Sequence, residues 1–200
     1  MDDVFSCYAS AAPTLIDRFE AVAPQQLYAP LADLLPRSPV RVADIGAGTG
    51  RDAAWFADLG HAVLAVEPVA ELRAAGLRLH PSPRIVWLDD RLPELAALRT
   101  RGPFDLVTLC AVWHHLDAEA RRIAILGLAA IVAPGGLLIV SLRHGPELLG
   151  RPVFPVPPEE TVAAASAAGF SLLRRVETES IQAANQAAGV RWTWLALRKI

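Results

Sequence analysis

Residues 42–50 read Val42-Ala43-Asp44-Ile45-Gly46-Ala47-Gly48-Thr49-Gly50, and they join a run of apolar residues to a helical pattern. Glycines let the backbone turn sharply and approach a ligand closely, because no Cβ stands in the way. A helix that begins after such a turn offers free N–H groups and the positive end of its dipole to a polar ligand group. The segment therefore predicts a strand, a ligand-binding turn and a helix. A turn that binds no ligand is the less favoured alternative.

Short apolar runs and helical patterns alternate along the chain from this turn. Apolar runs that are nearly continuous are typical of strands buried on both faces of a parallel sheet. The runs are residues 40–45, 62–66, 85–88, 104–109 and 137–142. The helical patterns between them are residues 51–59, 69–77 and 117–132, with a short turn at 94–98. Such alternation predicts a doubly wound α/β domain with right-handed crossovers.

The end of the chain follows a different pattern. A helix is predicted over residues 159–168, and strands over residues 170–176 and 190–197 follow it with no helix needed between them. Two successive strands without a crossover helix predict an antiparallel hairpin at one edge of the sheet. The proline-rich residues 143–158 are expected to form a long loop, and loops of this length are often functional.

Composition and charge narrow the class of protein. The chain has 200 residues, the size of one domain, and 53% of them are hydrophobic. The net charge is only −2 and the basic residues are scattered, so no nucleic-acid partner is expected. Cys7 and Cys110 lack metal-ligand spacing, so we expect reduced thiols, no metal site and a cytoplasmic location.

Residues 123–142 carry no charge and are about as long as a membrane span of roughly 20 residues. Pro134-Gly135-Gly136 interrupts this segment, and proline breaks a continuous helix. A helix, a turn and a buried strand are therefore predicted here, with no membrane partner.

The spacing of the glycines distinguishes between possible ligands. A dinucleotide fingerprint has the spacing G-x-G-x-x-G, with an acidic residue about 20 positions further on. Here the spacing is G-x-G-x-G, and Arg51 stands in place of the third fingerprint glycine. Glu67 ends the second predicted strand, and its carboxylate can accept hydrogen bonds from two ribose hydroxyls.

Five segments, taken in order, resemble the motifs of the class I S-adenosylmethionine-dependent methyltransferases of the small, single-domain bacterial type. They are residues 44–50, 63–68, 87–93, 104–116 and 128–140. The resemblance implies a Rossmann-like seven-stranded sheet in the order 3-2-1-4-5-7-6, with strand 7 antiparallel. It further implies one domain over residues 1–200: a helical lid (1–36), a cofactor-binding core (37–142), and the loop, helix and hairpin (143–200).

The same resemblance implies where S-adenosyl-L-methionine binds. The residues expected to contact it are Asp44, Gly46, Ala47, Gly48, Gly50, Glu67, Pro68, Asp89, Asp90 and Cys110. Of the adjacent carboxylates Asp89 and Asp90, one is expected to hold the adenine amino group, and Asp89 is preferred.

Candidates for the acceptor side follow the predicted strands. His114 and His115 come just after the fourth strand, at the carboxyl edge where ligands bind in such sheets. A histidine titrates near neutral pH and suits a general base, although capping or packing of the turn is the slightly preferred interpretation of each ring taken separately. Weaker candidates are Tyr8, Phe19, Glu20, Arg143 and His144, with Trp113 as a possible wall of the pocket and Trp192 and Trp194 expected in the core.

These observations predict methyl transfer from S-adenosylmethionine to an O, N or S nucleophile of a small molecule, by a monomer or homodimer. Two alternatives are a nicotinamide-dependent oxidoreductase and a catalytically inactive module that binds S-adenosylmethionine. The glycine spacing and the Pro-Gly-Gly turn disfavour the first alternative. Only the acceptor pocket separates the enzyme from the inactive module.

Overall fold

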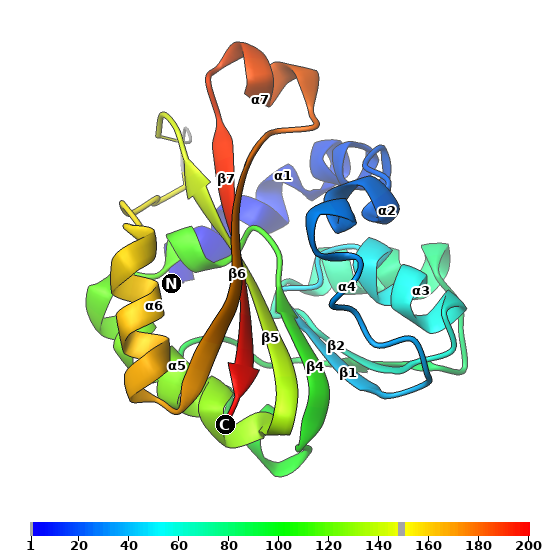
Figure 1. The fold of residues 1–200 in the computed structure, drawn as a ribbon. Coiled ribbons are helices and arrows are strands. Elements are labelled where there is room, and N and C mark those ends of the chain that lie inside the picture. The colour runs from blue at the N-terminus through cyan, green and yellow to red at the C-terminus, as the bar shows by residue number, and fades with distance from the viewer. Residues whose placement is uncertain (1, 148–150) are drawn as a thin grey trace.

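A seven-stranded sheet forms the central layer of the fold, in the order β3-β2-β1-β4-β5-β7-β6 (Figure 1). The computed structural model describes residues 2–147 and 151–200. The strands are β1 (Arg41–Ile45), β2 (Ala62–Val66), β3 (Ile85–Leu88), β4 (Phe104–Leu109), β5 (Val132–His144), β6 (Phe170–Glu179) and β7 (Arg191–Lys199). β7 is antiparallel to β5 and β6, and the other pairs are parallel. The predicted strand order and the antiparallel hairpin are confirmed.

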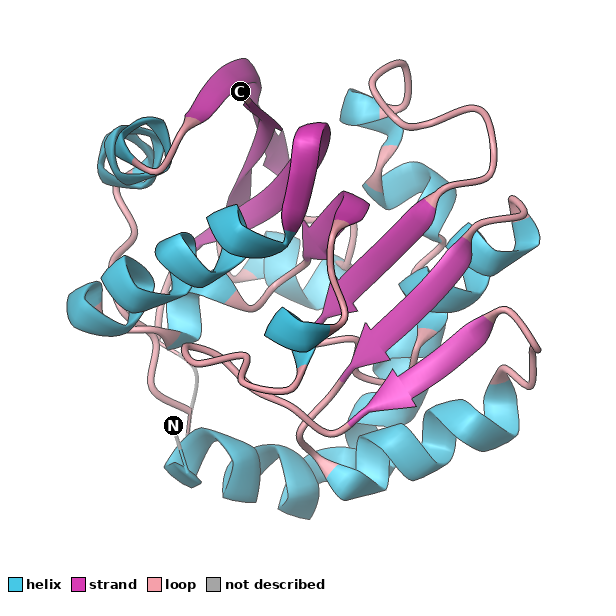
Figure 2. Cartoon of the chain, turned by 90° about the horizontal axis from the view of Figure 1, so that it is seen from below, coloured by secondary structure: helices cyan, strands magenta, loops and turns pink. Residues whose placement is uncertain are grey.

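Helices cover both faces of this sheet (Figure 2). They are α1 (Asp2–Glu20), α2 (Pro24–Leu27), α3 (Arg51–Asp58), α4 (Ala70–Leu79), α5 (Ala118–Ile131), α6 (Pro158–Ala167) and α7 (Ala183–Ala187). Short 3₁₀ turns are η1 (Ala29–Leu31), η2 (Leu98–Thr100) and η3 (Trp113–His115). Asp117 is the N-cap of α5, because its carboxylate accepts a hydrogen bond from the Ala120 N–H at 2.8 Å.

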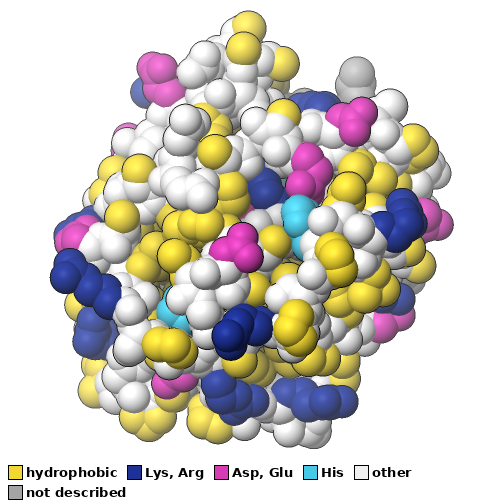
Figure 3. Space-filling view, turned by 90° about the vertical axis from the view of Figure 1, so that its right-hand side faces the viewer, with side chains coloured by type: hydrophobic (Ala, Val, Ile, Leu, Met, Phe, Trp, Pro, Cys, Tyr) yellow, Lys and Arg dark blue, Asp and Glu magenta, His cyan; other side chains and the backbone are white. Residues whose placement is uncertain are grey.

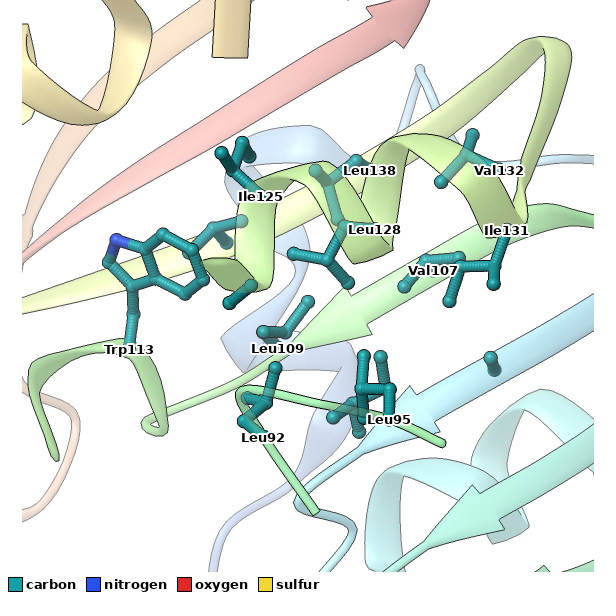
Figure 4. Packing of buried hydrophobic residues seen from close by; sticks show 14 of the residues in the cluster. Leu92, Leu95, Val107, Leu109, Trp113, Ile125, Leu128, Ile131, Val132 and Leu138 are labelled. Carbon is teal, nitrogen blue, oxygen red and sulfur yellow. The ribbon is translucent and has the colours of Figure 1, made fainter. Parts of the chain in front are cut away.

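Neighbouring residues of each central strand enter different hydrophobic clusters, which explains the continuous apolar runs in the sequence. In β1, Ala43 belongs to the cluster that α5 covers, whereas Val42 belongs to the cluster that contains Phe56 of α3. Successive side chains of a strand point to opposite faces, so both faces of this sheet are buried. Figure 4 shows Leu128 and Ile131 of α5 packed over the strands on one of these faces.

Two connections differ from the predictions. β5 begins at Val132, and Pro134-Gly135-Gly136 forms an irregularity inside it rather than a turn before it. Phe104 pairs with Val132 whereas Leu106 pairs with Leu137, so β5 bulges away from β4 where Gly135 has a φ of +75°. A short helix, α7, stands between β6 and β7, where no helix was needed.

Two predicted segments extend beyond the described residues. The long loop at residues 143–158 includes residues 148–150, and the helical lid at 1–36 includes residue 1, all of which lie outside them. Among residues 2–147 and 151–200, no helix is long and apolar enough to cross a membrane. The uncharged segment at residues 123–142 is divided between α5 and β5, as predicted.

Two buried helical glycines give a matched test of how closely the layers pack. A Cβ on Gly76 of α4 would lie 2.3 Å from the Trp87 ring and 2.7 Å from the Thr49 carbonyl oxygen. A Cβ on Gly127 of α5 would instead meet the flexible end of Arg99, at 2.9 Å. Alanine otherwise stabilises a helix by about 1 kcal/mol relative to glycine.

We expect Gly76→Ala to lower the free energy of unfolding by about 2 kcal/mol, because the added methyl group overpacks a rigid contact. Gly127→Ala is expected to leave that free energy unchanged or to raise it, since the Arg99 side chain can move. Urea unfolding of both variants measures the difference. Equal effects of the two substitutions would contradict the packing described for α4.

Candidate functional site

A cavity of about 310 Å³ opens where β1, β2 and β4 end. Its floor includes Gly46 and Ala47 after β1, Pro68 after β2 and Cys110 after β4. The strand order reverses between β1 and β4, and ligands of open α/β sheets bind at such a switch point. The remaining walls come from residues of α1 and α2, from the end of β6 and from the start of β7. The two ends of the chain thus meet at one site.

The glycine turn is held in place by the neighbouring strand. The N–H groups of Gly46 and Ala47 both donate to the Val66 carbonyl oxygen, at 2.8 and 3.0 Å. Gly46 has a φ of +73°, and a Cβ there would lie 2.4 Å from the Val112 side chain. Only glycine fits this position without displacing either the backbone or its neighbour.

Gly50 differs from the other glycines of the turn. It does not belong to the residues that line the cavity in the described part of the chain. A Cβ on Gly50 would instead lie 2.7 Å from the Trp87 ring. Gly50 thus has a packing role, since it lets the start of α3 lie close to β3, and its expected contact with a ligand stays a prediction.

Glu67 is buried beside the turn and lines the cavity. Its Oε2 accepts a hydrogen bond from the Gly48 N–H at 2.7 Å, and its Oε1 accepts one from the Val69 N–H at 2.8 Å. Burial raises the pKa of Glu67 to about 7, although both N–H donors act to lower it. Each carboxylate oxygen can accept a second hydrogen bond, so ligand hydroxyls still find acceptors here.

Asp44 presents an unsatisfied oxygen at the same site. The side chain is 2% exposed, and Oδ1 accepts a hydrogen bond from the Thr108 hydroxyl at 2.9 Å. Oδ2, like the Thr49 hydroxyl, has no hydrogen-bond partner among the described residues. Burial, together with the Asp52 carboxylate, raises the pKa of Asp44 to about 7. A buried polar atom without a partner is costly, so a ligand that donates a hydrogen bond or carries positive charge would stabilise this carboxylate.

Asp89 and Asp90 lie in different environments. Asp90 lines the cavity, and its two oxygens accept hydrogen bonds from the N–H groups of Arg91 and Leu98, at 2.9 and 2.8 Å. The Asp89 side chain is 67% exposed and pairs with Arg73 at 2.9 Å on the surface. Asp89, the carboxylate preferred for the adenine contact, is therefore not among the lining residues in the described part of the chain, whereas Asp90 is.

A buried polar network borders the opposite side of the cavity, and the sequence analysis did not find it. Arg51 donates to the Asp52 carboxylate at 2.7 Å and to the Phe19 carbonyl oxygen at 3.0 Å. The Tyr28 hydroxyl donates to the other Asp52 oxygen at 3.1 Å. Burial raises the pKa of the nearby Cys110 thiol, which therefore stays protonated at neutral pH. The signal in the sequence is the Arg51-Asp52 pair, which follows the last glycine of the turn.

The two histidines after β4 have different surroundings. His115 lines the cavity, its Nδ1 lies 2.8 Å from the Pro152 carbonyl oxygen, and its Nε2 lies 3.0 Å from the Tyr8 hydroxyl. A carbonyl oxygen only accepts, so Nδ1 carries the proton and the Tyr8 hydroxyl donates to Nε2. Burial lowers the pKa of His115, which favours the neutral ring. His114 is buried behind it, outside the cavity lining, with its ring 5.9 Å from that of Trp192.

The remaining acceptor candidates also separate. Tyr8 and Phe19 line the cavity, whereas Glu20 pairs with His80 of α4's end at 3.0 Å. Arg143 donates to a backbone carbonyl oxygen in the loop after β5, at 2.7 Å. Neither Arg143 nor His144 lines this cavity in the described part of the chain. Neither residue is therefore placed to bind an anionic ligand there.

The three tryptophans match their expected roles only in part. Trp113 is buried in the core, where its indole N–H donates to the Thr161 hydroxyl at 3.2 Å (Figure 4). Trp192 and Trp194 both line the cavity, although core positions were expected for them. Trp194 is at the same time a core residue, since only 3% of it is exposed. His144, the other weak candidate, instead makes a 2.8 Å hydrogen bond with the Thr193 hydroxyl.

Neither the surface charge nor the metal-ligating side chains of the described residues indicate a second functional site. On the face shown in Figure 3, Lys and Arg side chains are scattered among acidic and hydrophobic ones. Within residues 2–147 and 151–200, no group of three or more His, Cys, Asp or Glu side chains could hold a metal ion.

Comparison with known proteins identifies the kind of domain. Residues 43–140 match the family described as "Methyltransferase domain". The chain is 35% identical over 105 residues to a ubiquinone biosynthesis O-methyltransferase of Bradyrhizobium sp. (strain ORS 278), a match that covers 52% of this chain and 40% of that protein. The chain spans less than half the length of the curated relatives it matches.

Solved structures share the fold over almost the whole chain. The 1,6-didemethyltoxoflavin-N1-methyltransferase of Burkholderia thailandensis has a TM-score of 0.74 at 21% identity, covering 99% of this chain and 88% of that chain. That structure contains 1,6-didemethyltoxoflavin and S-adenosylhomocysteine. Magnesium protoporphyrin IX methyltransferase from Synechocystis PCC 6803, with bound S-adenosylmethionine, has a TM-score of 0.69 at 17% identity, covering 91% and 80% of the two chains.

The raised pKa values predict how stability depends on pH. Asp44 and Glu67 titrate near pH 7 in the folded chain but near pH 4 when exposed, so the folded state holds extra protons between these limits. The free energy of unfolding therefore falls as the pH rises through this window, by at most about 1.4 kcal/mol per pH unit for each group.

We expect Asp44→Asn to reduce this fall between pH 5 and 8, because one of the two buried acids is removed. Urea unfolding at several pH values measures the slope. Asp89→Asn, on the surface, is the matched control and is expected to keep the slope of the wild type. A slope unchanged in Asp44→Asn would show that Asp44 is ionised throughout this range.

Proposed function

We propose that this chain, which belongs by its matched domain and its fold to the class I S-adenosylmethionine-dependent methyltransferases, transfers a methyl group from S-adenosylmethionine to a small molecule. The observation that carries the proposal is the cavity at the switch point, where the glycine turn and Glu67 lie side by side. The names of the relatives include an O-methyltransferase and an N1-methyltransferase, so the proposal covers O and N nucleophiles, and it keeps the S nucleophile that the sequence analysis allowed.

The residues of the cavity suit the three parts of this cofactor. We assign the ribose hydroxyls to Glu67, whose oxygens each keep a free lone pair, and the adenine amino group to Asp90. The amino-acid end falls to the glycine turn and to Asp44, whose Oδ2 has no partner among the described residues. When bound, S-adenosylmethionine supplies a methyl group that its sulfonium has already activated.

The protein's main contribution is to position the acceptor, since an activated methyl donor needs little covalent help. Holding two reactants in line can supply several kcal/mol of the rate acceleration. Residues of α1 and α2 close one side of the cavity, and the β6–β7 hairpin closes the other. We therefore assign residues 1–36 the role of a lid that excludes water and fixes the acceptor.

His115 and Tyr8 provide a route for the proton that leaves the acceptor. Because Tyr8 donates to His115 Nε2, a proton received by the Tyr8 oxygen can be matched by transfer of the phenol proton to Nε2. The Pro152 carbonyl oxygen keeps the other proton on Nδ1, which leaves Nε2 basic. His114 is not among the lining residues in the described part of the chain, so we assign the catalytic function to His115 alone.

Calorimetric titration tests the cofactor. We expect the purified protein to bind S-adenosylmethionine and S-adenosylhomocysteine saturably and to show no binding of NAD. Asp90→Asn is expected to raise the Kd for S-adenosylhomocysteine about tenfold, the size of one lost hydrogen bond to a charged group. Asp89→Asn, one residue away on the surface, should change that Kd less than about twofold. Absence of binding by the wild type would overturn the proposed function.

The proton route predicts a kinetic difference between the two histidines. With an acceptor found by screening small O, N and S nucleophiles, His115→Gln and Tyr8→Phe are expected to lower kcat by about a hundredfold. Both variants should keep the wild-type Kd for S-adenosylhomocysteine. His114→Gln, checked for folding by its Tm, is the control and should retain most of kcat. Equal losses in both histidine variants would remove the assignment to His115.

A further inference from the structure

The cavity has an aromatic wall, and its lining holds more carboxylates than guanidinium groups. We propose that the methyl acceptor is a small aromatic compound without an anionic group, and that its ring lies against Trp192. This inference rests on the proposed function, because it names the class of acceptor for that reaction.

Trp192 and Trp194 form the wall from one strand. They stand two residues apart on β7, so their side chains leave the same face of the sheet, and both line the cavity. The Trp194 ring lies 5.4 Å from the Tyr28 ring, and Tyr28 in turn stacks on Trp55 at 5.3 Å with an angle of 24°. The Trp192 ring meets the edge of the His114 ring. Contacts with neighbouring rings therefore fix the orientation of both indoles before a flat ligand binds.

The hairpin that carries these rings is tied to the other side of the cavity. The Gln182 side chain, just before α7, donates to the Arg18 carbonyl oxygen at 3.1 Å. Arg174 of β6 donates to the Pro30 carbonyl oxygen at 3.1 Å and to the Asp33 carboxylate at 2.8 Å. These contacts join the end of the chain to its N-terminal segment. The aromatic wall consequently keeps its distance from the glycine turn opposite.

The charges of the lining disfavour an anionic acceptor. The lining carboxylates are Asp44, Asp52, Glu67, Asp90 and Glu179, and the lining guanidinium groups are Arg51 and Arg91. Arg51 already donates to a carboxylate and a carbonyl oxygen, and Arg91 lies with its guanidinium 5.7 Å from the Phe5 ring of α1. A carboxylate or phosphate on the acceptor would thus meet more carboxylates than guanidinium groups in the lining, while Arg143 and Arg151 act on Tyr8 and His115 from outside it. A neutral or cationic ring meets no such cost.

The size of the cavity limits the acceptor further. Sites for small molecules usually have volumes of about 300–1,000 Å³. The cavity of about 310 Å³ lies at the lower end of that range and must hold the cofactor as well as the acceptor. We therefore expect a small acceptor, and the polar side chains of Thr178 and Asn185 in the lining can bind its substituents.

Three two-ring probes of matched size test this inference on the full chain saturated with S-adenosylhomocysteine. They are quinolin-8-ol, which is neutral and aromatic, quinaldate, which is aromatic and anionic, and decahydronaphthalen-1-ol, which is neutral and saturated. Ligand-observed NMR is expected to give quinolin-8-ol a Kd at least about tenfold lower than the other two, in line with one stacking contact and the absence of charge repulsion. Equal or tighter binding of quinaldate or decahydronaphthalen-1-ol, or no binding of quinolin-8-ol, would overturn the inference.

Substitutions on the wall locate the binding. Trp192→Leu is expected to raise the Kd for quinolin-8-ol about tenfold, whereas Trp192→Phe retains a ring and should stay within about threefold of the wild type. Trp87→Phe, on an indole outside both the cavity lining and the aromatic wall, is the control and should change nothing. Unchanged binding in Trp192→Leu would place the acceptor elsewhere. The Kd for S-adenosylhomocysteine, measured on the same samples, separates the two proposals: its loss in the wild type contradicts the proposed function, whereas normal cofactor binding without aromatic preference contradicts only the acceptor class.

Discussion

The site depends on one buried carboxylate that joins two neighbouring strand ends. Glu67 follows β2 and accepts the Gly48 N–H of the turn after β1, while the Val69 N–H at the start of α4 binds its other oxygen. The Val66 carbonyl oxygen, one residue earlier, accepts the N–H groups of Gly46 and Ala47. Val66 and Glu67, at the end of β2, therefore hold the connection after β1 and the connection after β2 together by hydrogen bonds. Any movement of the glycine turn would break these bonds, so the turn and the carboxylate keep one fixed arrangement toward a ligand.

Local patterns in the sequence predict the parts of the molecule whose causes are local. A strand buried on both faces needs apolar residues throughout, and a strand-to-helix turn that crosses positive φ needs glycine, so β1, the turn and α3 are readable from residues 42–59. The strand order follows from the resemblance of five segments rather than from any one of them. The bulge in β5 was not predicted, because Pro134-Gly135-Gly136 signals an interruption without telling whether the strand resumes in register or begins there.

Which of two adjacent residues faces the cavity is a tertiary question. Asp89 and Asp90 carry the same group, and the path of the backbone after β3 directs only the second toward the ligand side, where the N–H groups of Arg91 and Leu98 hold it. His114 and His115 likewise share one 3₁₀ turn, and the orientation of His115 is set by Tyr8 from α1 and Pro152 from the distant loop. Contacts between segments so far apart in sequence leave no trace in the spacing of residues near the histidines.

Burial of the Asp44 and Glu67 carboxyl groups lowers the stability of the fold, and this loss of stability is linked to ligand binding. Asp44 and Glu67 both have pKa values raised to about 7, because burial removes water from carboxylates that the protein itself satisfies only in part. A ligand with hydroxyl donors and positive charge would return these groups to their ionised form. These carboxylates lower the stability of the protein without ligand, and the interactions that they gain with a ligand contribute to its affinity. The lining as a whole holds more carboxylates than guanidinium groups, and this charge favours a cationic methyl donor over an anionic ligand.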